Sequence, residues 1–264
     1  MTTFATDKRA LHVERVGAGP RVTVITHGFL GQGRNLRTLA NRWAAKDSTR
    51  ALWLIDLPGH GQSAPLLATE SLRSMAEAVV ETVRAQGHSG SFEWVGHSLG
   101  GRVGLAAADA FAGDLSRLVL LDIAPGPIAP ETHESRRVVE LLCQAPASAT
   151  SRQAMRAALL ALGLGEPTAD WLLLNLASKP EDGVAWRIDR VALREFHARV
   201  SREDLWSVPA QRRVPMLLVR GSRSRLVGPD DVRRLESLGV EVKVVEAGHD
   251  VHAEAPDAVL AAIA

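Results

Sequence analysis

Residues 92–111 constrain the fold of this chain more than any other stretch. The run Phe92-Glu-Trp-Val has the apolar character of a β-strand, and the alanine-rich run from Arg102 onward has that of a helix. Between them stands Gly-His-Ser-Leu-Gly, with Ser98 at its centre. A strand-to-helix turn of this composition holds a serine hydroxyl clear of the backbone, since the two glycines let neighbouring chain pass close by. The pattern therefore predicts a nucleophilic serine at a helix N-terminus, whose free N–H groups favour negative charge.

The segments around this turn alternate between apolar strands and amphipathic helices. The clearest strands are 21–26, 51–56 and 115–122, and the clearest helices are 35–45 and 71–86. Near-continuous apolar strands are typical of a sheet that is covered on both faces. We therefore predict an α/β fold with a mostly parallel central sheet flanked by helices, in which ligands bind beyond the carboxyl ends of the strands.

The alternation stops once, between residues 126 and 211. This part is expected to be mostly helical, with helices at 131–144, 151–162, 167–178 and 191–206. One interruption of this length fits a lid inserted into a single sheet better than a second domain. We predict a core in two parts, residues 1–125 and 212–264, with a helical lid (126–211) inserted after the sixth strand.

A serine hydroxyl is a poor nucleophile at neutral pH, so Ser98 needs a base. Of the nine histidines, His249 is the candidate, because Ala-Gly-His-Asp-Val-His directly follows the last expected strand. A loop at that edge of the sheet can place an imidazole over the serine. His97 and His252 are assigned to local packing.

The acid that orients this base is left open by the sequence. An aspartate is expected after the strand 215–220, but Ser224 stands there. Asp122 is the better candidate, because it ends the strand that follows the serine's own strand and therefore emerges at the same edge of the sheet. Asp230 or Asp231 is the alternative, although an N-cap at the start of a helix is the simpler interpretation for both.

An acyl-transfer site also needs donors for the oxyanion. The backbone N–H groups of Phe29 and Leu99 are the candidates, one in the loop after an early strand and one directly after Ser98. His27, Gly28 and Leu30 in the first loop, and Arg102 in the helix, are the further residues expected to contact substrate. Phe29 is also expected to form an apolar wall.

Four motifs resemble the α/β-hydrolase fold superfamily, and they occur in the order that this superfamily has. They are His27-Gly-Phe-Leu-Gly, Asp56-Leu-Pro-Gly-His-Gly-Gln-Ser, Gly96-His-Ser-Leu-Gly-Gly-Arg and Gly248-His-Asp-Val-His-Ala-Glu-Ala-Pro. The resemblance implies the α/β-hydrolase fold over most of the chain outside the lid.

Three further features resemble the small YbfF-type serine esterases. They are Leu121-Asp-Ile-Ala-Pro, Trp186-Arg-Ile-Asp and Gly221-Ser-Arg-Ser, with serine at the usual acid position. In those relatives the strand-ending aspartate is thought to serve the triad, and the resemblance implies the same role for Asp122.

The expected function is therefore that of a serine hydrolase, which cleaves esters or thioesters of small to medium acyl groups through an acyl-enzyme. Two alternatives stay open. Gly100-Gly-Arg102 resembles the motif of menaquinone-pathway lyases, which suggests a cofactor-free C–C hydrolase or lyase. The missing acid at Ser224 suggests a binding protein of the same fold without activity. The natural substrate and its chain length are not given by these patterns.

Composition sets limits on the partners. With 31 basic and 30 acidic residues, the net charge of +1 predicts no general attraction to nucleic acid or to anionic membranes. No apolar run is long enough for a membrane span, and the single Cys143 excludes an internal disulfide framework. No metal-ligand cluster and no cofactor fingerprint is expected. We predict a cytoplasmic monomer or small homo-oligomer that acts on a small-molecule acyl substrate.

Overall fold

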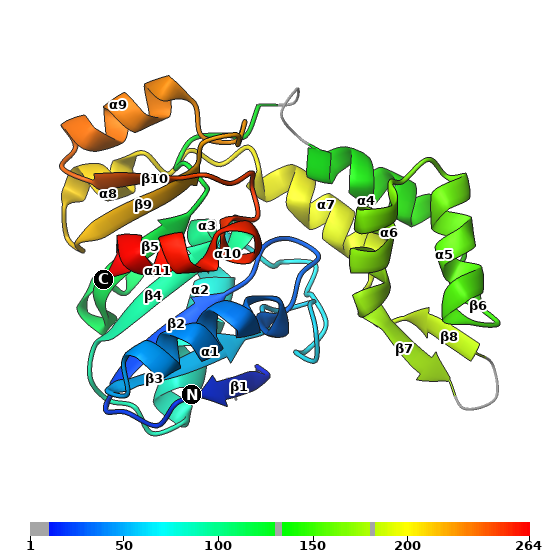
Figure 1. The fold of residues 1–264 in the computed structure, drawn as a ribbon, viewed down its shortest axis with the longest axis horizontal. Helices are drawn as coiled ribbons and strands as arrows, with labels where there is room; N and C mark the ends of the chain where they lie inside the picture. The colour runs from blue at the N-terminus through cyan, green and yellow to red at the C-terminus, as the bar shows by residue number, and fades with distance from the viewer. Residues whose placement is uncertain (1–10, 130–133, 180–182) are drawn as a thin grey trace, which may run out of the picture.

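A seven-stranded sheet forms the centre of the computed structural model, which describes residues 11–129, 134–179 and 183–264 (Figure 1). The strands lie in the order β1 (Val13–Val16), β3 (Arg50–Ile55), β2 (Arg21–Thr26), β4 (Phe92–His97), β5 (Leu115–Leu121), β9 (Met216–Gly221) and β10 (Glu241–Val245). Strand β1 runs antiparallel to β3, and the other neighbours are parallel. The expected mostly parallel sheet is confirmed.

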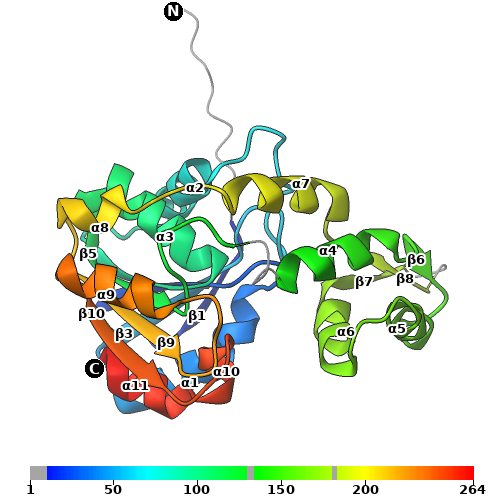
Figure 2. The ribbon, with the colours of Figure 1, turned by 90° about the horizontal axis from the view of Figure 1, so that it is seen from above.

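Helices cover both faces of this sheet (Figure 2). One face carries α1 (Arg37–Lys46), α10 (Val251–Glu254) and α11 (Pro256–Ile263), and the other carries α2 (Leu72–Ala85), α3 (Leu99–Ala110), α8 (Ser207–Gln211) and α9 (Pro229–Ser237). Successive strand residues alternate between the two layers: Leu54 packs with the first set, whereas Trp53 and Ile55 pack with the second. This alternation explains why the strands are apolar throughout.

A segment inserted between β5 and β9 lies beside the main sheet (Figure 1). It contains α4 (Glu134–Gln144), β6 (Ser148–Ala149), α5 (Arg152–Ala161), α6 (Glu166–Leu172), β7 (Leu176–Lys179), β8 (Gly183–Trp186) and α7 (Arg190–Val200). The three short strands form an antiparallel sheet of their own, in the order β6-β8-β7. Among the described residues, no helix is both long and apolar enough to span a bilayer.

Several expectations for this segment are wrong in detail. In the described part of the chain, the insertion follows the fifth strand, β5, and not the sixth. The helix expected at 167–178 ends at Leu172, because the chain then pairs with β8 as strand β7. The helix expected at 191–206 ends at Val200. The first residues of the expected 131–144 helix lie outside the described residues.

The carboxyl ends of the parallel strands position the candidate residues. Ser98 follows β4, Asp122 follows β5, and His249 lies in the loop after β10. Helix α8 falls inside the range 126–211 that we expected for the lid, but it packs beside α3. Because the strands run in the same direction, residues far apart in the sequence meet at one edge of the sheet.

Candidate active site

Ser98 lies at a strained turn between β4 and α3. Its φ is 51° and its ψ is −113°, a conformation that costs free energy for a residue with a side chain. The turn also needs its glycines: a Cβ on Gly96 would lie 2.3 Å from the Gly100 carbonyl oxygen, and one on Gly100 would lie 2.5 Å from Thr26 Oγ1. The local geometry is the one that the sequence pattern predicts.

His249 forms a hydrogen bond with Asp122, whose side chain is fully buried. Nδ1 of His249 lies 2.8 Å from Oδ2 of Asp122, and the histidine side chain is 34% exposed. Because a carboxylate accepts, Nδ1 carries the proton of the neutral ring, which leaves a lone pair on Nε2. Asp122 itself has a positive φ of 53°, directly after β5.

Two further donors hold the Asp122 carboxylate. The Gly221 N–H donates to Oδ1 at 2.8 Å, and the Ser224 hydroxyl donates to Oδ2 at 2.5 Å. Ser224 therefore contacts the carboxylate of Asp122, which follows another strand of the sheet. These two hydrogen bonds hold both carboxylate oxygens in place beside His249.

The alternative acids lie elsewhere. Both belong to the first turn of α9, as the N-cap interpretation predicts. Asp231 accepts the Gly228 N–H at 2.9 Å, and Asp230 pairs with Arg233. The structure therefore brings Asp122, and neither of these, to His249.

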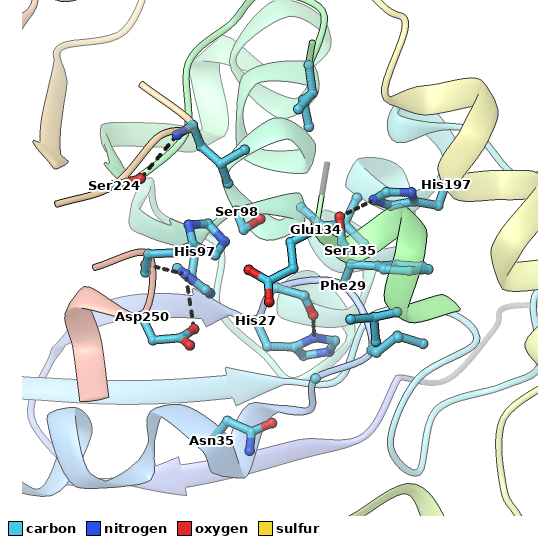
Figure 3. A pocket seen from close by; sticks show the side chains of 18 of the residues that line it. His27, Phe29, Asn35, His97, Ser98, Glu134, Ser135, His197, Ser224 and Asp250 are labelled. Atoms are coloured by element: carbon cyan, nitrogen blue, oxygen red, sulfur yellow. Dashed lines mark hydrogen bonds and ion pairs between the residues drawn. The ribbon is translucent and has the colours of Figure 1, made fainter. Parts of the chain in front are cut away.

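Ser98 and His249 line one cavity of about 670 Å³. His249 contacts Asp122 through its ring and His97 through its carbonyl group, and within the described residues no hydrogen bond joins its ring directly to the Ser98 hydroxyl. Catalytic hydrogen bonds are often long without substrate and shorten in the complex. Figure 3 shows Ser98 at the centre of this cavity, with Phe29 and Glu134 around it.

The loop after β2 forms another wall of the cavity. The backbone N–H groups of Phe29 and Leu99 both border it, and within the described part of the chain neither donates a hydrogen bond. Leu30 has a positive φ of 60°, and its carbonyl accepts Nδ2 of the buried Asn175 at 2.9 Å. Gly28 is required for close approach, because a Cβ there would lie 2.9 Å from His97 Nδ1. Two residues that line the cavity with Ser98 thus carry a backbone N–H that donates no hydrogen bond within the described residues.

Arg102 borders the cavity, but its guanidinium is committed to the backbone. It donates to the carbonyl groups of Gly126 at 2.7 Å, Val200 at 3.1 Å and Glu203 at 2.6 Å. The side chain is buried, and its three hydrogen bonds tie both ends of the inserted segment to α3. The substrate contact expected for Arg102 stays a prediction.

A model of the alpha/beta hydrolase family matches residues 23–262. The chain belongs to this family. Its curated relatives include Esterase YbfF of Escherichia coli (strain K12), which is 29% identical to this alpha/beta hydrolase over 247 residues, covering 91% of the chain and 90% of the relative. The likeness to YbfF that the motifs indicate is confirmed.

Two other comparisons agree on the fold of this alpha/beta hydrolase. The sn-1-specific diacylglycerol lipase ABHD11 of Danio rerio is 25% identical over 246 residues, which cover 88% of this chain and 74% of the lipase. A solved structure described as a marine microorganism esterase superposes with a TM-score of 0.84 at 23% identity, covering 96% of this chain and 97% of the other. The latter match shows the fold alone.

Two buried histidines support the loop of this alpha/beta hydrolase. His27, expected to contact substrate, lines the cavity, but its Nδ1 donates to the Gly28 carbonyl at 2.8 Å and its Nε2 accepts the Leu57 N–H at 3.0 Å. Its ring centroid lies 5.1 Å from that of His60. Burial lowers the pKa of His27 to about 4 and that of His60 to about 3. Both rings are therefore neutral in the folded protein at pH 7.

These two histidines should make folding stability depend on pH. Because their pKa values are lowered below the unfolded value of about 6.5, their contribution is fully present above that pH and is lost as the pH falls toward 4. In the unfolded chain these two residues bind up to two more protons in this window, so they alone should lower the free energy of unfolding by as much as about 3 kcal/mol per pH unit. Urea unfolding at pH 8, 7, 6 and 5 measures this. Equal stability at pH 8 and pH 5 would contradict it, and His60→Asn should flatten the slope.

His197 also lines the cavity, although no pattern in the sequence predicts it there. Its ring stacks on Phe29 with centroids 4.1 Å apart, and its Nε2 lies 3.3 Å from Ser135 Oγ (Figure 3). Phe29 thus forms the apolar wall that we expected, with a histidine of the inserted segment stacked on it. No sequence signal marks this pairing, because α7 and the loop after β2 are distant along the chain.

Proposed function

We propose that this protein is a serine hydrolase that cleaves carboxylic esters or thioesters of small to medium acyl groups through an acyl-enzyme. The observation that carries the proposal is the hydrogen bond between Asp122 and His249. His249 lines the same cavity as Ser98, which lies at its strained turn. The names of two relatives, an esterase and a diacylglycerol lipase, support ester hydrolysis.

In the proposed mechanism, His249 acts first as base and then as acid. With its Nδ1–H donated to Asp122, the Nε2 lone pair accepts the Ser98 proton as the oxygen attacks the carbonyl carbon. Nε2 then returns the proton to the leaving alcohol or thiol. Water then attacks the acyl carbon of the acyl-enzyme while Nε2 takes the water proton. Nε2 returns this proton to Ser98 Oγ as the carboxylic acid leaves. Asp122 stays ionised and stabilises the imidazolium that forms at each step.

Phe29 and Leu99 supply the oxyanion donors in this proposal. Their N–H groups make no other hydrogen bond in the described residues, so they are available when the carbonyl oxygen becomes negative. The N-terminus of α3 adds its dipole at the same place.

The inserted segment supplies the rest of the cavity wall, through residues such as Ile128, Val138 and Trp171. It therefore acts as a lid in this proposal and contributes apolar surface for the acyl group. Two contacts favour the hydrolase over the other two interpretations of the sequence: Arg102 donates to backbone carbonyl groups, and Asp122 accepts from His249.

Covalent labelling tests the proposal directly. A fluorophosphonate probe should modify the protein once, and peptide mass spectrometry should place the adduct on Ser98. A panel of p-nitrophenyl esters and acyl thioesters of rising chain length then defines the preferred substrate. A protein that takes up no probe and hydrolyses no member of the panel would overturn the proposal.

Asn175 should matter to catalysis through Leu30. Asn175→Ala removes the hydrogen bond to the Leu30 carbonyl and frees the loop that carries the Phe29 N–H. We expect kcat to fall about tenfold with KM little changed, because the loop's donor acts mainly on the transition state. Affinity for a boronic acid, which mimics the tetrahedral intermediate, should fall in parallel. Arg152→Ala is the matched control, since Arg152 donates to the Leu173 carbonyl in the same turn. Equal losses in both variants would contradict a specific role for Asn175.

A further inference from the structure

Three side chains meet next to His249 without serving the proposed mechanism. They are His97, Asp250 and His252, and each offers one ligand atom within 4.8 Å of the other two. Nε2 of His97 lies 3.8 Å from Oδ1 of Asp250, and the His97 and His252 ring centroids are 4.5 Å apart. Figure 3 shows His97 and Asp250 side by side near Ser98.

The two histidines of this cluster are suited to bind a cation. His97 is 4% exposed and His252 is 7% exposed, and burial lowers the pKa of His97 to about 4 and that of His252 well below its ordinary value. Both rings are therefore neutral at pH 7, as metal ligands must be. Nδ1 of His252 is buried and has no hydrogen-bond partner within the described residues. Asp250 adds a carboxylate whose side chain is 64% exposed.

We propose that His97, Asp250 and His252 form a binding site for a divalent transition-metal ion of the Zn²⁺ and Cu²⁺ class, and that its occupancy inhibits the enzyme. Two imidazoles and one carboxylate favour such ions over Mg²⁺ or Ca²⁺, which prefer oxygen ligands. Metal bonds of about 2.0–2.1 Å would bring tetrahedral ligand atoms to about 3.3 Å from one another. Rotation of the exposed Asp250 side chain would bring its carboxylate oxygen closer to the two imidazole nitrogens. Water would fill the remaining coordination position.

The link to activity runs through the His249 backbone. His97 Nε2 donates to the His249 carbonyl at 3.1 Å, and the two rings lie 4.6 Å apart. A nitrogen that binds a metal cannot donate, so the His97 proton moves from Nε2 to Nδ1 and the bond to His249 is lost. The ring keeps one proton and no net release occurs. The loop that carries His249 then loses one of the contacts that hold it, and this part of the proposal rests on the proposed function.

Metal binding is measured first, without reference to activity. Chelator-treated protein is titrated with Zn²⁺ by calorimetry and with Co²⁺ by visible absorption, which reports coordination by nitrogen. We expect one ion per chain, with binding at least about tenfold weaker in Asp250→Asn and in His252→Gln. His88→Gln, at a histidine remote from the cluster, is the control and should bind as the unmodified protein does. Absence of binding, or equal binding by all variants, overturns the site.

Inhibition is measured next, with p-nitrophenyl butyrate and each variant compared with its own metal-free rate. Zn²⁺ should inhibit the unmodified protein reversibly, with full recovery after chelation, and Asp250→Asn should need at least about tenfold more Zn²⁺ for half inhibition. Inhibition that is unchanged in Asp250→Asn would place the ion on Ser98 and His249 instead and overturn the proposal. If the protein hydrolyses no ester, the inhibitory link falls with the proposed function, whereas calorimetry still decides whether the site exists.

Discussion

Replacing Ser98 with alanine is expected to lower kcat for ester hydrolysis by about 10⁴-fold or more. The variant removes the oxygen that attacks the ester carbonyl and carries the acyl group, and His249 and the oxyanion donors cannot replace it. Hydrolysis of p-nitrophenyl butyrate under saturating substrate measures the change. Ser135→Ala is the matched control, since Ser135 is another serine that lines the same cavity.

Glycine at the same position separates loss of the nucleophile from loss of the fold. Ser98 has a φ of 51°, which glycine adopts without strain. Ser98→Gly should therefore be as inactive as Ser98→Ala and yet more stable than the unmodified protein, by about 1 kcal/mol. Thermal unfolding checks the second part. Activity of either variant within tenfold of the unmodified enzyme would refute Ser98 as the nucleophile.

The sequence predicts this turn well because its geometry is set locally. Gly96 and Gly100 are the residues that the close approach requires, and the strand before and the helix after them are defined by their own periodicity. The parallel sheet follows from the alternation of such segments. His249 follows in turn, because a loop after the last strand lies at the same edge.

Contacts between distant segments could not be predicted in this way. Ser224 was expected to mark an absent acid, and its hydrogen bond to Asp122 depends on β5 and β9 being neighbours in the sheet. Asn175 and His197 meet the loop after β2 only because the inserted segment turns back onto it. Periodicity along the chain carries no information about such pairings.

Secondary structure within the inserted segment shows the same limit. Residues 176–178 were expected to end the helix 167–178, but they belong to β7 and pair with β8. Tertiary pairing overrides local propensity in a segment this short. The end of α7 at Val200 is likewise marked by a distant residue, since Arg102 takes the Val200 and Glu203 carbonyl groups.

Asp122→Asn is expected to lower kcat by about 10³–10⁴-fold while leaving the fold intact. The amide has the size of the carboxylate and can still accept the Gly221 N–H through its oxygen. Its NH₂ group would then face Nδ1 of His249, which must accept instead of donate. The ring is held in the tautomer with its proton on Nε2, and it can no longer take the Ser98 proton. The pre-steady-state rate of acylation measures this loss directly.

Two other variants show whether the effect belongs to Asp122. Asp231→Asn keeps an oxygen to accept the Gly228 N–H, so it should retain nearly full activity. Ser224→Ala removes one donor to the carboxylate but not its charge, and a loss of about tenfold is expected for one hydrogen bond to a charged group. If Asp231→Asn were the damaging change and Asp122→Asn the mild one, the acid would come from α9. The Asp122 carboxylate that Ser224 contacts would then have no part in the reaction. In that case Ser224 would stand, as first expected, at a position from which the acid is absent.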